Sequence, residues 1–366
     1  MTIDISLNEK TYDKLKSEKE KNNLADNSWD DWFNHVFPDV SDFEYTEDII
    51  KKIQEKNVLK HYFDSWVKNF ALNLNNIWND KSASTLHSDI QFSDSKSSAI
   101  VIGRGPSLKK NSHLKILSES DYNGTIICTD GALKTVLNEG VTPEKFPNFI
   151  VVSIDSQDKI TKYYDDSIIT KFGKQIKCVL STTISPLTYN TAKKAGMDVY
   201  WLHTLFDYDK GKSSFNHIAG LMSRSKNENK KFPAIQTGGN VGTSSWIIGW
   251  SLLKVTHIAL IGIDHGFTPE TTWEEIGEFH PSAKAALDYD KNSEIFQKAF
   301  PKIYNPDFDC YCIQDPIFQY YSNALKEFIP KTTKYVKTIN ATEGGSIFGE
   351  GIHCMKLKEF LSDYNF

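Results

Sequence analysis

The sequence lacks long hydrophobic runs and a surplus of positive charge. No stretch approaches the ~20 apolar residues that a membrane-spanning helix needs. Residues 1–6 show no basic start followed by an apolar run, which a secretory signal would have. We therefore expect a cytoplasmic protein without a membrane span. With 42 basic and 47 acidic residues and a net charge of −5, the chain has no basic excess for contact with nucleic acid, which is not expected as a partner.

Cysteine is also scarce. The five cysteines are odd in number and scattered along the chain, which indicates reduced thiols and not a disulfide framework. Cys310 and Cys312 could in principle help to hold a metal, but no second close pair accompanies them, so we expect no metal site there. What the sequence does contain, 39% hydrophobic and 24% charged residues, is typical of a globular protein.

Four segments follow from the pattern along the chain. Residues 1–95 are polar with helical spacing of apolar residues, and they predict a helical N-terminal region ending in a Ser- and Asp-rich linker. Residues 96–265 predict the ligand-binding core. Residues 266–330, rich in aromatics with several prolines and glycines, predict a lid or acceptor region and a helix. Residues 331–366 predict a last strand and a C-terminal helix that complete the core.

Short apolar runs, separated by helical lengths, dominate the sequence from residue 98 onward. Runs that are apolar on both faces and alternate with helices are typical of a parallel sheet covered by helices on both sides. They predict a doubly wound α/β fold, in which ligands bind beyond the C-terminal ends of the strands. The runs are 99–102, 125–128, 149–154, 178–180, 199–202, 258–263 and 335–339.

Two glycine-rich loops could hold a nucleotide. In the loop 103–107, Gly103 and Gly105 would let the backbone approach a phosphate or ribose, and Pro106 suits the first turn of a helix whose free N–H groups attract anions. The loop has neither the third glycine of a dinucleotide fingerprint nor the Gly-Lys-Ser/Thr of a P-loop, so a tight strand-to-helix turn is the alternative. The cluster 237–245 has the same two interpretations, ligand approach or helix packing.

Acidic residues follow several of the predicted strands. Asp155 and Asp264 each come directly after an apolar run, as do acids that bind ribose hydroxyls or Mg²⁺ in many α/β enzymes. Either residue could instead cap the following helix, and the same ambiguity holds for Asp130. Glu343 precedes two glycines, which could let its carboxylate face the pocket or could form a turn into the last helix.

Two of the ten histidines, His265 and His280, lie after the sixth strand in the predicted lid region. A neutral imidazole there could take a proton from an acceptor hydroxyl. The candidate catalytic residues are therefore His280, His265 and Asp264. The candidate nucleotide-binding residues are Gly103, Arg104, Gly105, Pro106, Ser107, Thr129, Asp130, Ser153, Asp155, Thr237, Gly238, Gly239 and Asn240.

Five segments together resemble a known group, the motility-associated factors and archaeal 6-hydroxymethylpterin diphosphokinase (MptE-like) proteins. The resemblance spans roughly residues 70–360, and its segments occur in the same order. They are Gly-Arg-Gly-Pro-Ser-Leu (103–108), Ile-Cys-Thr-Asp-Gly-Ala-Leu-Lys (127–134), Val-Val-Ser-Ile-Asp (151–155), Leu-Ile-Gly-Ile-Asp (260–264) and Asn-Ala-Thr-Glu-Gly-Gly (340–345). The core is also similar to bacterial sialyltransferases, although Thr-Gly-Gly at 237–239 replaces their Thr-Ser-Gly.

The resemblance implies a mostly parallel, Rossmann-like sheet of the GT-A/sialyltransferase-like kind and a transferase activity. Our first hypothesis is a glycosyltransferase-like enzyme that uses a nucleotide-activated sugar, for example a nonulosonic acid donor, to modify a protein or glycan. His280 or His265 would be the base. Gly277–Pro281 matches the Gly-x-x-His-Ala motif of the flagellin-modifying relatives with Pro in place of Ala, which favours His280.

Two alternatives remain open. The chain could be a diphosphotransferase that takes ATP and a pterin alcohol, with Mg²⁺ held by Asp155 and Asp264. Mg²⁺ is the only cofactor considered, and only under this hypothesis. The chain could also be a non-catalytic nucleotide-binding protein. The sequence is compatible with a homo-oligomer and specifies no oligomeric state.

Overall fold

The computed structural model of the protein describes residue 16 and residues 60–90, 97–206 and 214–365. Apart from residue 16, these belong to one compact unit, residues 53–366. Most of the predicted helical region, including Trp29, Trp32 and Phe33, lies outside the described residues. Trp78 donates its indole N–H to the carbonyl oxygen of Met222 at 2.8 Å.

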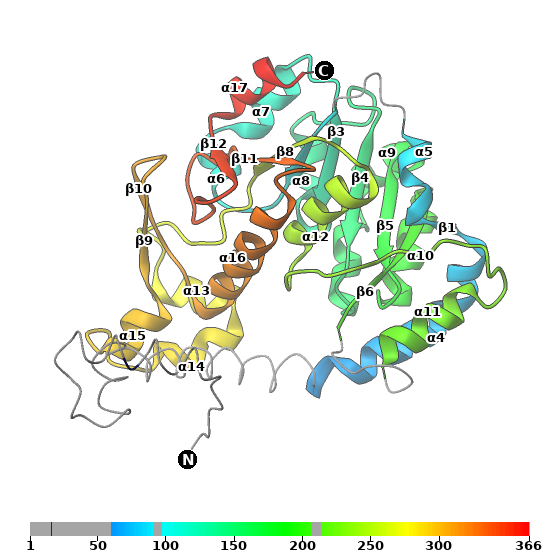
Figure 1. Cartoon of the computed structure of the whole chain (residues 1–366), viewed down its shortest axis with the longest axis horizontal. Coiled ribbons are helices and arrows are strands. Elements are labelled where there is room, and N and C mark those ends of the chain that lie inside the picture. The colour runs from blue at the N-terminus through cyan, green and yellow to red at the C-terminus, as the bar shows by residue number, and fades with distance from the viewer. Residues whose placement is uncertain (1–15, 17–59, 91–96, 207–213, 366) are drawn as a thin grey trace. The chain divides into compact units, whose positions relative to one another are not determined.

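A parallel sheet forms the centre of the described chain (Figure 1). Its strands are β1 Lys81–Ser82, β2 Ser98–Ile102, β3 Thr125–Thr129, β4 Phe149–Ser153, β5 Lys177–Ser181, β6 Asp198–Thr204, β7 Ala234–Ile235, β8 His257–Ile261, β11 Lys337–Asn340 and β12 Ile352–Cys354. They lie in the order β1-β6-β5-β4-β3-β2-β8-β11-β12, and β7 pairs with β6. Each of these pairings is parallel. The predicted doubly wound α/β fold is confirmed.

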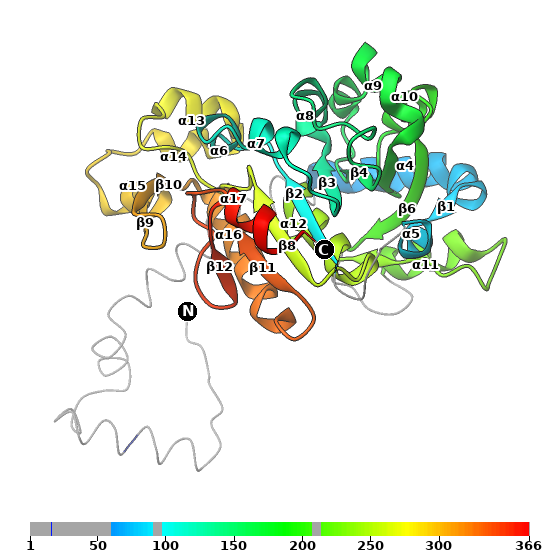
Figure 2. The ribbon, with the colours of Figure 1, turned by 90° about the horizontal axis from the view of Figure 1, so that it is seen from above.

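Helices cover both faces of the sheet (Figure 2). They are α4 Lys60–Asn79, α5 Leu86–Asp89, α6 Ser107–Lys110, α7 His113–Glu119, α8 Leu133–Asn138, α9 Ser167–Phe172, α10 Pro186–Lys194, α11 Phe215–Arg224, α12 Val241–Ile247, α13 Trp273–Phe279, α14 Lys284–Leu287, α15 Glu294–Ala299, α16 Pro316–Phe328 and α17 Leu357–Asp363. Side chains alternate between the two faces: Ile100 and Ile102 of β2 join the core under α7 and α8, whereas Ala99 and Val101 join the core under α12 and α16.

The order in which the strands follow one another across the sheet reverses at β2. From β2 it runs outward through β3, β4, β5 and β6, and then β8 pairs with the opposite side of β2. The loops that follow β2 and β8 therefore leave the sheet side by side and continue in opposite directions. In open parallel sheets this point is where a crevice forms and ligands bind.

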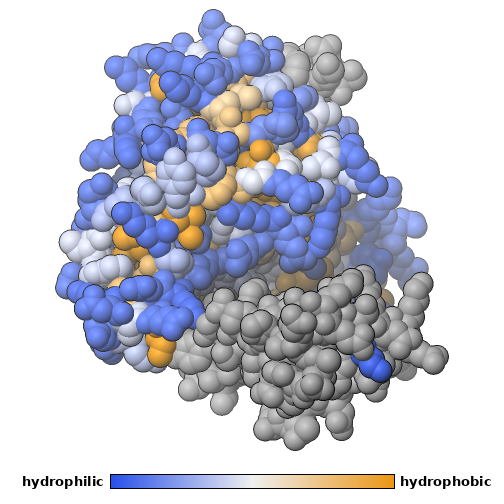
Figure 3. Space-filling model, turned by 60° about the vertical axis from the view of Figure 1, so that its left-hand side comes forward, coloured by the Kyte–Doolittle hydropathy of each residue, from blue (hydrophilic) through white to orange (hydrophobic). Residues whose placement is uncertain are grey.

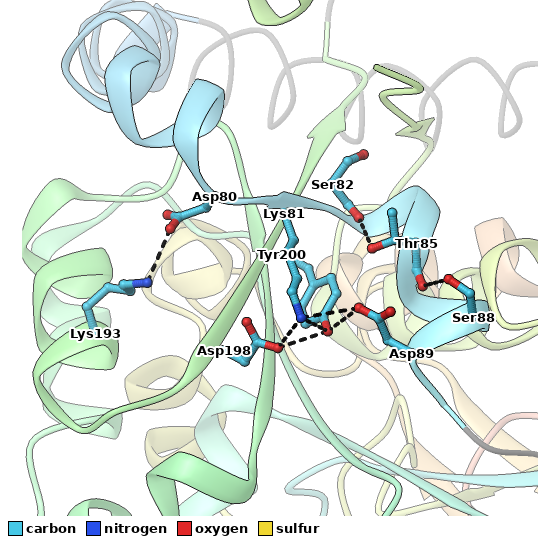
Figure 4. A network of polar contacts seen from close by, with 9 residues as sticks. All are labelled: Asp80, Lys81, Ser82, Thr85, Ser88, Asp89, Lys193, Asp198 and Tyr200. Carbon is cyan, nitrogen blue, oxygen red and sulfur yellow. Dashed lines mark hydrogen bonds and ion pairs between the residues drawn. The ribbon is translucent and has the colours of Figure 1, made fainter. Parts of the chain in front are cut away.

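Residues 81–90 differ from the linker predicted for this part of the chain. Lys81 begins edge strand β1, and its ammonium group lies 2.8 Å from the carboxylate of Asp198 and 3.3 Å from that of Asp89 (Figure 4). Leu86 and Ile90 are buried in the core on the α12 side. The Ser- and Asp-rich composition suggested a linker, but these widely spaced apolar side chains anchor the segment to the sheet.

The segment 266–313 has a hydrophobic cluster of its own. Three short helices, α13 to α15, surround Phe267, Ile276, Phe296 and Phe300. A two-stranded antiparallel hairpin follows, formed by β9 Lys302–Asn305 and β10 Cys310–Ile313. The segment predicted as a lid is thus a packed subdomain attached after β8.

The surface in Figure 3 is mostly hydrophilic, with hydrophobic residues in small groups. Within the described ranges, no helix has both the length and the apolar character needed to cross a membrane.

Candidate functional site

Two glycines allow the loops after β2 and β8 to pack against each other. The N–H of Gly103 donates to the carbonyl of Ile261 at 2.9 Å, and the N–H of Gly105 donates to the carbonyl of Gly262 at 2.8 Å. A Cβ atom on Gly105 would lie 1.8 Å from Oδ2 of Asp264. Contact between the two loops thus already requires glycine at position 105, whether or not a ligand also approaches it.

Asp264 lies at the centre of this contact. Its side chain is almost buried, with 7% exposed, and the hydroxyl of Ser107 donates to its Oδ2 at 2.9 Å. Burial raises the pKa of Asp264 to about 7, although the hydrogen bond from Ser107 opposes this shift. Near neutral pH the carboxyl group therefore exists in both protonation states, as an acceptor or as a hydrogen-bond donor.

A second acidic group occupies the ends of β3 and β4. The hydroxyl of Ser153 donates a short hydrogen bond to Asp130, and the Thr129 hydroxyl donates to the carbonyl of Ile102 at 3.1 Å. Burial raises the pKa of Asp130 to about 6, and the nearby charge of Asp155 raises it further. The structure thus brings together four of the predicted residues, Thr129, Asp130, Ser153 and Asp155, at the ends of the neighbouring strands β3 and β4.

Arg104 links the strand ends to the subdomain. Its aliphatic stem packs on Gly131, where a Cβ atom would lie 3.1 Å from the arginine Cδ. Its guanidinium donates to the hydroxyl of Tyr163 at 3.0 Å and lies 5.2 Å from the ring centre of Phe279 on α13. Its positive charge also lowers the pKa of Asp130, against the larger effect of burial.

Asp155 and Asp264 are not arranged as joint ligands of one metal ion. They follow β4 and β8, which β3 and β2 separate in the sheet, so the strand axes lie about 14 Å apart. Asp155 accepts the N–H of Gln157 at 3.0 Å, and burial raises its pKa. Among the described residues no group of three or more His, Cys, Asp or Glu side chains could hold a metal. Mg²⁺ would fit here only with one carboxylate and with phosphate oxygens of a substrate.

The second glycine cluster faces α16. Gly238 and Gly239 have φ values of +56° and +80°, which favour glycine. A Cβ atom on Gly239 would lie 2.4 Å from the ring of Tyr320. Asn240 caps α12 by accepting the N–H of Thr243 at 2.8 Å, and Thr237 accepts the N–H of Gly239 at 3.1 Å. The loop is thus shaped by its own hydrogen bonds and by the aromatic surface of α16.

His265 is held neutral in the interior. It has a φ of +43°, only 6% of its surface is exposed, and its ring stacks on Phe318 with the centroids 6.2 Å apart. Burial lowers the pKa of His265 to about 3. Its Nδ1 has no hydrogen-bond partner among the described residues.

His280 has a partner that the sequence did not reveal. Its Nδ1 lies 2.5 Å from Oδ2 of Asp315, which is fully buried at the start of α16. The other oxygen of Asp315 accepts the N–H of Phe318 at 2.7 Å, so the carboxylate is fixed in position. The His280 side chain remains 16% exposed. A carboxylate that holds Nδ1 orients the ring and leaves Nε2 as the nitrogen for proton transfer.

Tyr321 on α16 brings these elements into one neighbourhood. Its ring centre lies 5.9 Å from that of His265 and 6.4 Å from that of His280. Burial raises the pKa of Tyr321, and the charges of Asp315 and Asp155 add to the shift. The loop after β8 and the end of α13 therefore meet at this helix.

Glu343 lies in a different environment. It has a φ of +56°, its carboxylate lies 3.3 Å from Nε2 of His113 on α7, and it accepts the N–H of Leu357 at 3.2 Å. These contacts tie the loop after β11 to α7 and α17. Among the described residues, no hydrogen bond or ion pair connects the carboxylate of Glu343 to His265 or His280.

A pocket of about 540 Å³ lies at the strand ends of β4 and β5, beside α4. It adjoins Asp155, since that side chain accepts the N–H of the pocket residue Gln157. Its lining residues are Tyr62, Ser65, Lys68, Asn69, Leu72, Ser156, Gln157, Asp158, Ser185, Pro186 and Leu187.

The fold and the polar strand-end loops define a parallel α/β protein with a candidate ligand site at its topological switch point. The family described as 6-hydroxymethylpterin diphosphokinase MptE-like matches residues 68–270, more than half of the chain, and the chain belongs to this family. The predicted family is thus confirmed.

The chain is also similar to a solved structure, the MAf glycosyltransferase from Magnetospirillum magneticum AMB-1. The TM-score is 0.48 and the sequence identity 14%, over 77% of this chain and 38% of that one. The chain therefore spans well under half the length of this relative. No protein with a curated description matches the sequence.

Proposed function

We propose that the protein is a transferase that moves a glycosyl group from a nucleotide-activated sugar to an acceptor hydroxyl. The observation that carries this proposal is the pair formed by His280 and Asp315, which lies beside the loops of the switch point. A buried carboxylate that orients a partly exposed imidazole is the arrangement that general-base catalysis needs.

In this proposal the donor binds at the strand ends. The loop 103–107 with Arg104, and the loop 237–240 facing α16, would hold the nucleotide. Arg104 supplies a positive charge at the ends of β2 and β3, where a diphosphate or phosphate would lie. The carboxyl group of Asp264, with a pKa of about 7, could donate a hydrogen bond to a donor oxygen in its protonated form.

The chemical step then follows from the position of His280. Nε2 of the imidazole takes the proton of the acceptor hydroxyl while the hydroxyl oxygen forms a bond to the anomeric carbon of the donor sugar. The bond between that carbon and the phosphate oxygen breaks, and the nucleotide leaves with the electron pair. Asp315 stabilises the imidazolium that forms, because its carboxylate is already hydrogen-bonded to Nδ1. A nonulosonic acid is one donor to include among those tested.

Diphosphate transfer from ATP to a pterin alcohol is the second candidate, and the description of the family favours it. This reaction needs its transferred charge neutralised, which in most such enzymes is done by Mg²⁺. One carboxylate, that of Asp155 or that of Asp264, would then bind the ion together with the phosphate oxygens of ATP.

Nucleotide binding with and without Mg²⁺ distinguishes the two reactions. The experiment is calorimetric titration and thermal unfolding with CMP, UDP, GDP and ATP. For glycosyl transfer we expect CMP, UDP or GDP, the nucleotides of activated sugars, to stabilise the protein without metal, because a ligand of the folded state raises its stability. Arg104→Gln should weaken that binding at least tenfold, whereas Lys109→Gln, on an exposed side chain of the same turn, should not. Binding of ATP alone, and only with Mg²⁺, would instead support diphosphate transfer.

A further inference from the structure

The pocket beside α4 is separate from the residues that the proposed donor site uses. Its volume of about 540 Å³ lies within the range of roughly 300–1,000 Å³ that small-molecule sites occupy. It opens at the same edge of the sheet as the switch point, on the side of β4 and β5. A transferase must hold a second substrate, and the donor site accounts for only one.

Helix α4 forms one wall of this pocket and is held rigidly. The side-chain amide of Asn69 donates to the carbonyls of Ser156 and Thr183, both at 3.0 Å. One turn further along, the amide of Asn73 donates to the carbonyl of Ile184 at 2.8 Å. These buried bonds connect the helix to the loops after β4 and β5, so the pocket is formed before any ligand arrives.

Most of the side chains that line the pocket end in polar groups. The amide of Gln157 donates to the hydroxyl of Tyr62 at 3.2 Å, and the hydroxyl of Ser185 donates to Asp158. Lys68 adds an ammonium group. Hydroxyl, amide, ammonium and carboxylate groups provide both donors and acceptors, whereas sites for apolar ligands are lined mainly by hydrophobic side chains.

We propose that this pocket is the acceptor subsite and that it binds a sugar, a statement that rests on the proposed glycosyl transfer. The ring of Tyr62 offers an apolar face to one side of a sugar ring, and the polar lining provides partners for its hydroxyls. A pterin is a flat aromatic ring that would need apolar contact on both faces, and Tyr62 is the only aromatic residue among those that line the pocket.

The pocket opens at the same edge of the sheet as the proposed donor site. Asp155, which follows β4, accepts the N–H of the pocket residue Gln157 at 3.0 Å. The loops that line the pocket follow β4 and β5, and the loops of the switch point follow β2 and β8. An acceptor sugar in the pocket would therefore lie at the carboxyl ends of the strands, as the nucleotide donor does in the proposed reaction.

Ligand-observed NMR on the full chain tests the subsite. The probes are methyl glycosides of glucose, galactose, N-acetylglucosamine and N-acetylneuraminic acid. At least one should show saturation transfer, and Ser65→Phe, which fills the pocket from α4, should weaken its binding at least tenfold. Ala71→Phe, an equal change at an exposed position of α4 outside the lining, should keep the affinity within twofold. Circular dichroism and thermal unfolding establish that both variants are folded.

The outcomes separate this proposal from the reaction itself. Failure of every glycoside to bind, or equal binding by folded Ser65→Phe, overturns the sugar subsite. Binding of 6-hydroxymethylpterin that Ser65→Phe abolishes also overturns it, in favour of a pterin acceptor. If a glycoside binds in this pocket but no nucleotide binds the wild-type chain, the sugar site stands and the proposed transfer fails. Nucleotide affinity should be unchanged in Ser65→Phe.

Discussion

The ring centres of His265 and His280 lie 5.9 Å and 6.4 Å from that of Tyr321, yet the environments of the two histidines differ. His265, at the end of β8, is buried without a partner for Nδ1, and its lowered pKa keeps it neutral. His280, at the end of α13, is partly exposed and bonded to a buried carboxylate. A base must accept a proton and hold it for a moment, which requires a group that stabilises the cation. From this comparison we propose His280 as the base and a packing role for His265.

The largest expected effect separates the two histidines directly. His280→Ala should lower turnover by about 10²–10⁴-fold while nucleotide affinity stays within a few-fold, because in the proposed reaction the imidazole acts on the acceptor and not on the nucleotide. His265→Ala should mainly lower the free energy of unfolding, by about 1–3 kcal/mol, because it removes a buried ring. Steady-state kinetics, nucleotide titration and chemical denaturation measure these effects. A larger loss of turnover in His265→Ala would reverse the assignment.

Asp315→Asn tests the partner of the base. The amide oxygen of the asparagine can still accept the N–H of Phe318 and cap α16. The amide NH₂ group, however, cannot accept the hydrogen bond that Nδ1–H of His280 donates to the carboxylate. We expect turnover to fall roughly 10–10³-fold with little change in stability. If Asp315→Asn keeps full turnover, the carboxylate has no part in orienting the base.

The next prediction concerns the contact between the loops after β2 and β8, beside His265. Gly105→Ala places a Cβ atom 1.8 Å from Oδ2 of Asp264, so one loop must move, and we expect a loss of about 1–3 kcal/mol in the free energy of unfolding. Gly220→Ala is the matched control. Its Cβ atom meets nothing within 4 Å on helix α11, so alanine should be neutral or slightly stabilising. Equal effects of the two changes would contradict the tight contact between the loops.

The last prediction concerns the pH dependence of stability. The pKa of Asp264 rises from 3.8 to about 7 on folding, so its contribution to stability is greatest below about pH 4 and is lost as the pH rises to about 7. Asp264→Asn cannot ionise, so relative to the wild type it should gain stability as the pH rises from 4 to 8. The lowered pKa of His265 has the opposite effect and makes stability fall with decreasing pH. This effect is the same in the wild type and in Asp264→Asn, so it cancels in the difference. Denaturation curves at both pH values measure the difference, and parallel curves would show that Asp264 is already ionised at low pH.

Much of the architecture was predictable from the sequence, because each strand run carries its own signal. The run 258–263 is apolar on both faces and corresponds to β8, and the loops with Gly103 and Asp264 were expected at the strand ends where they lie. That these two loops touch depends on the strand order, which no local pattern contains. The segment 82–90 was misjudged because its composition is polar, although Leu86 is fully buried.

The parts of the candidate site that the sequence did not predict depend on long-range contacts. Asp315 followed by Pro316 is a recognisable helix start, and the structure shows Asp315 capping α16. Its second oxygen reaches His280, 35 residues earlier, and no spacing rule relates the two. The polar pocket beside α4 was equally inaccessible, because its wall comes from a segment that precedes the sheet and its floor from loops about 90–120 residues later.

The asparagine contacts of α4 also have a consequence for the order of folding. The amides of Asn69 and Asn73 bond to carbonyls up to 114 residues later in the chain, at the end of β5. During synthesis α4 leaves the ribosome long before these partners exist. Closing so long a loop is entropically costly and slow compared with local helix formation. The helix must therefore dock late, after β4 and β5 have joined the sheet, and until then its apolar face with Phe70 and Ile77 is available to chaperones.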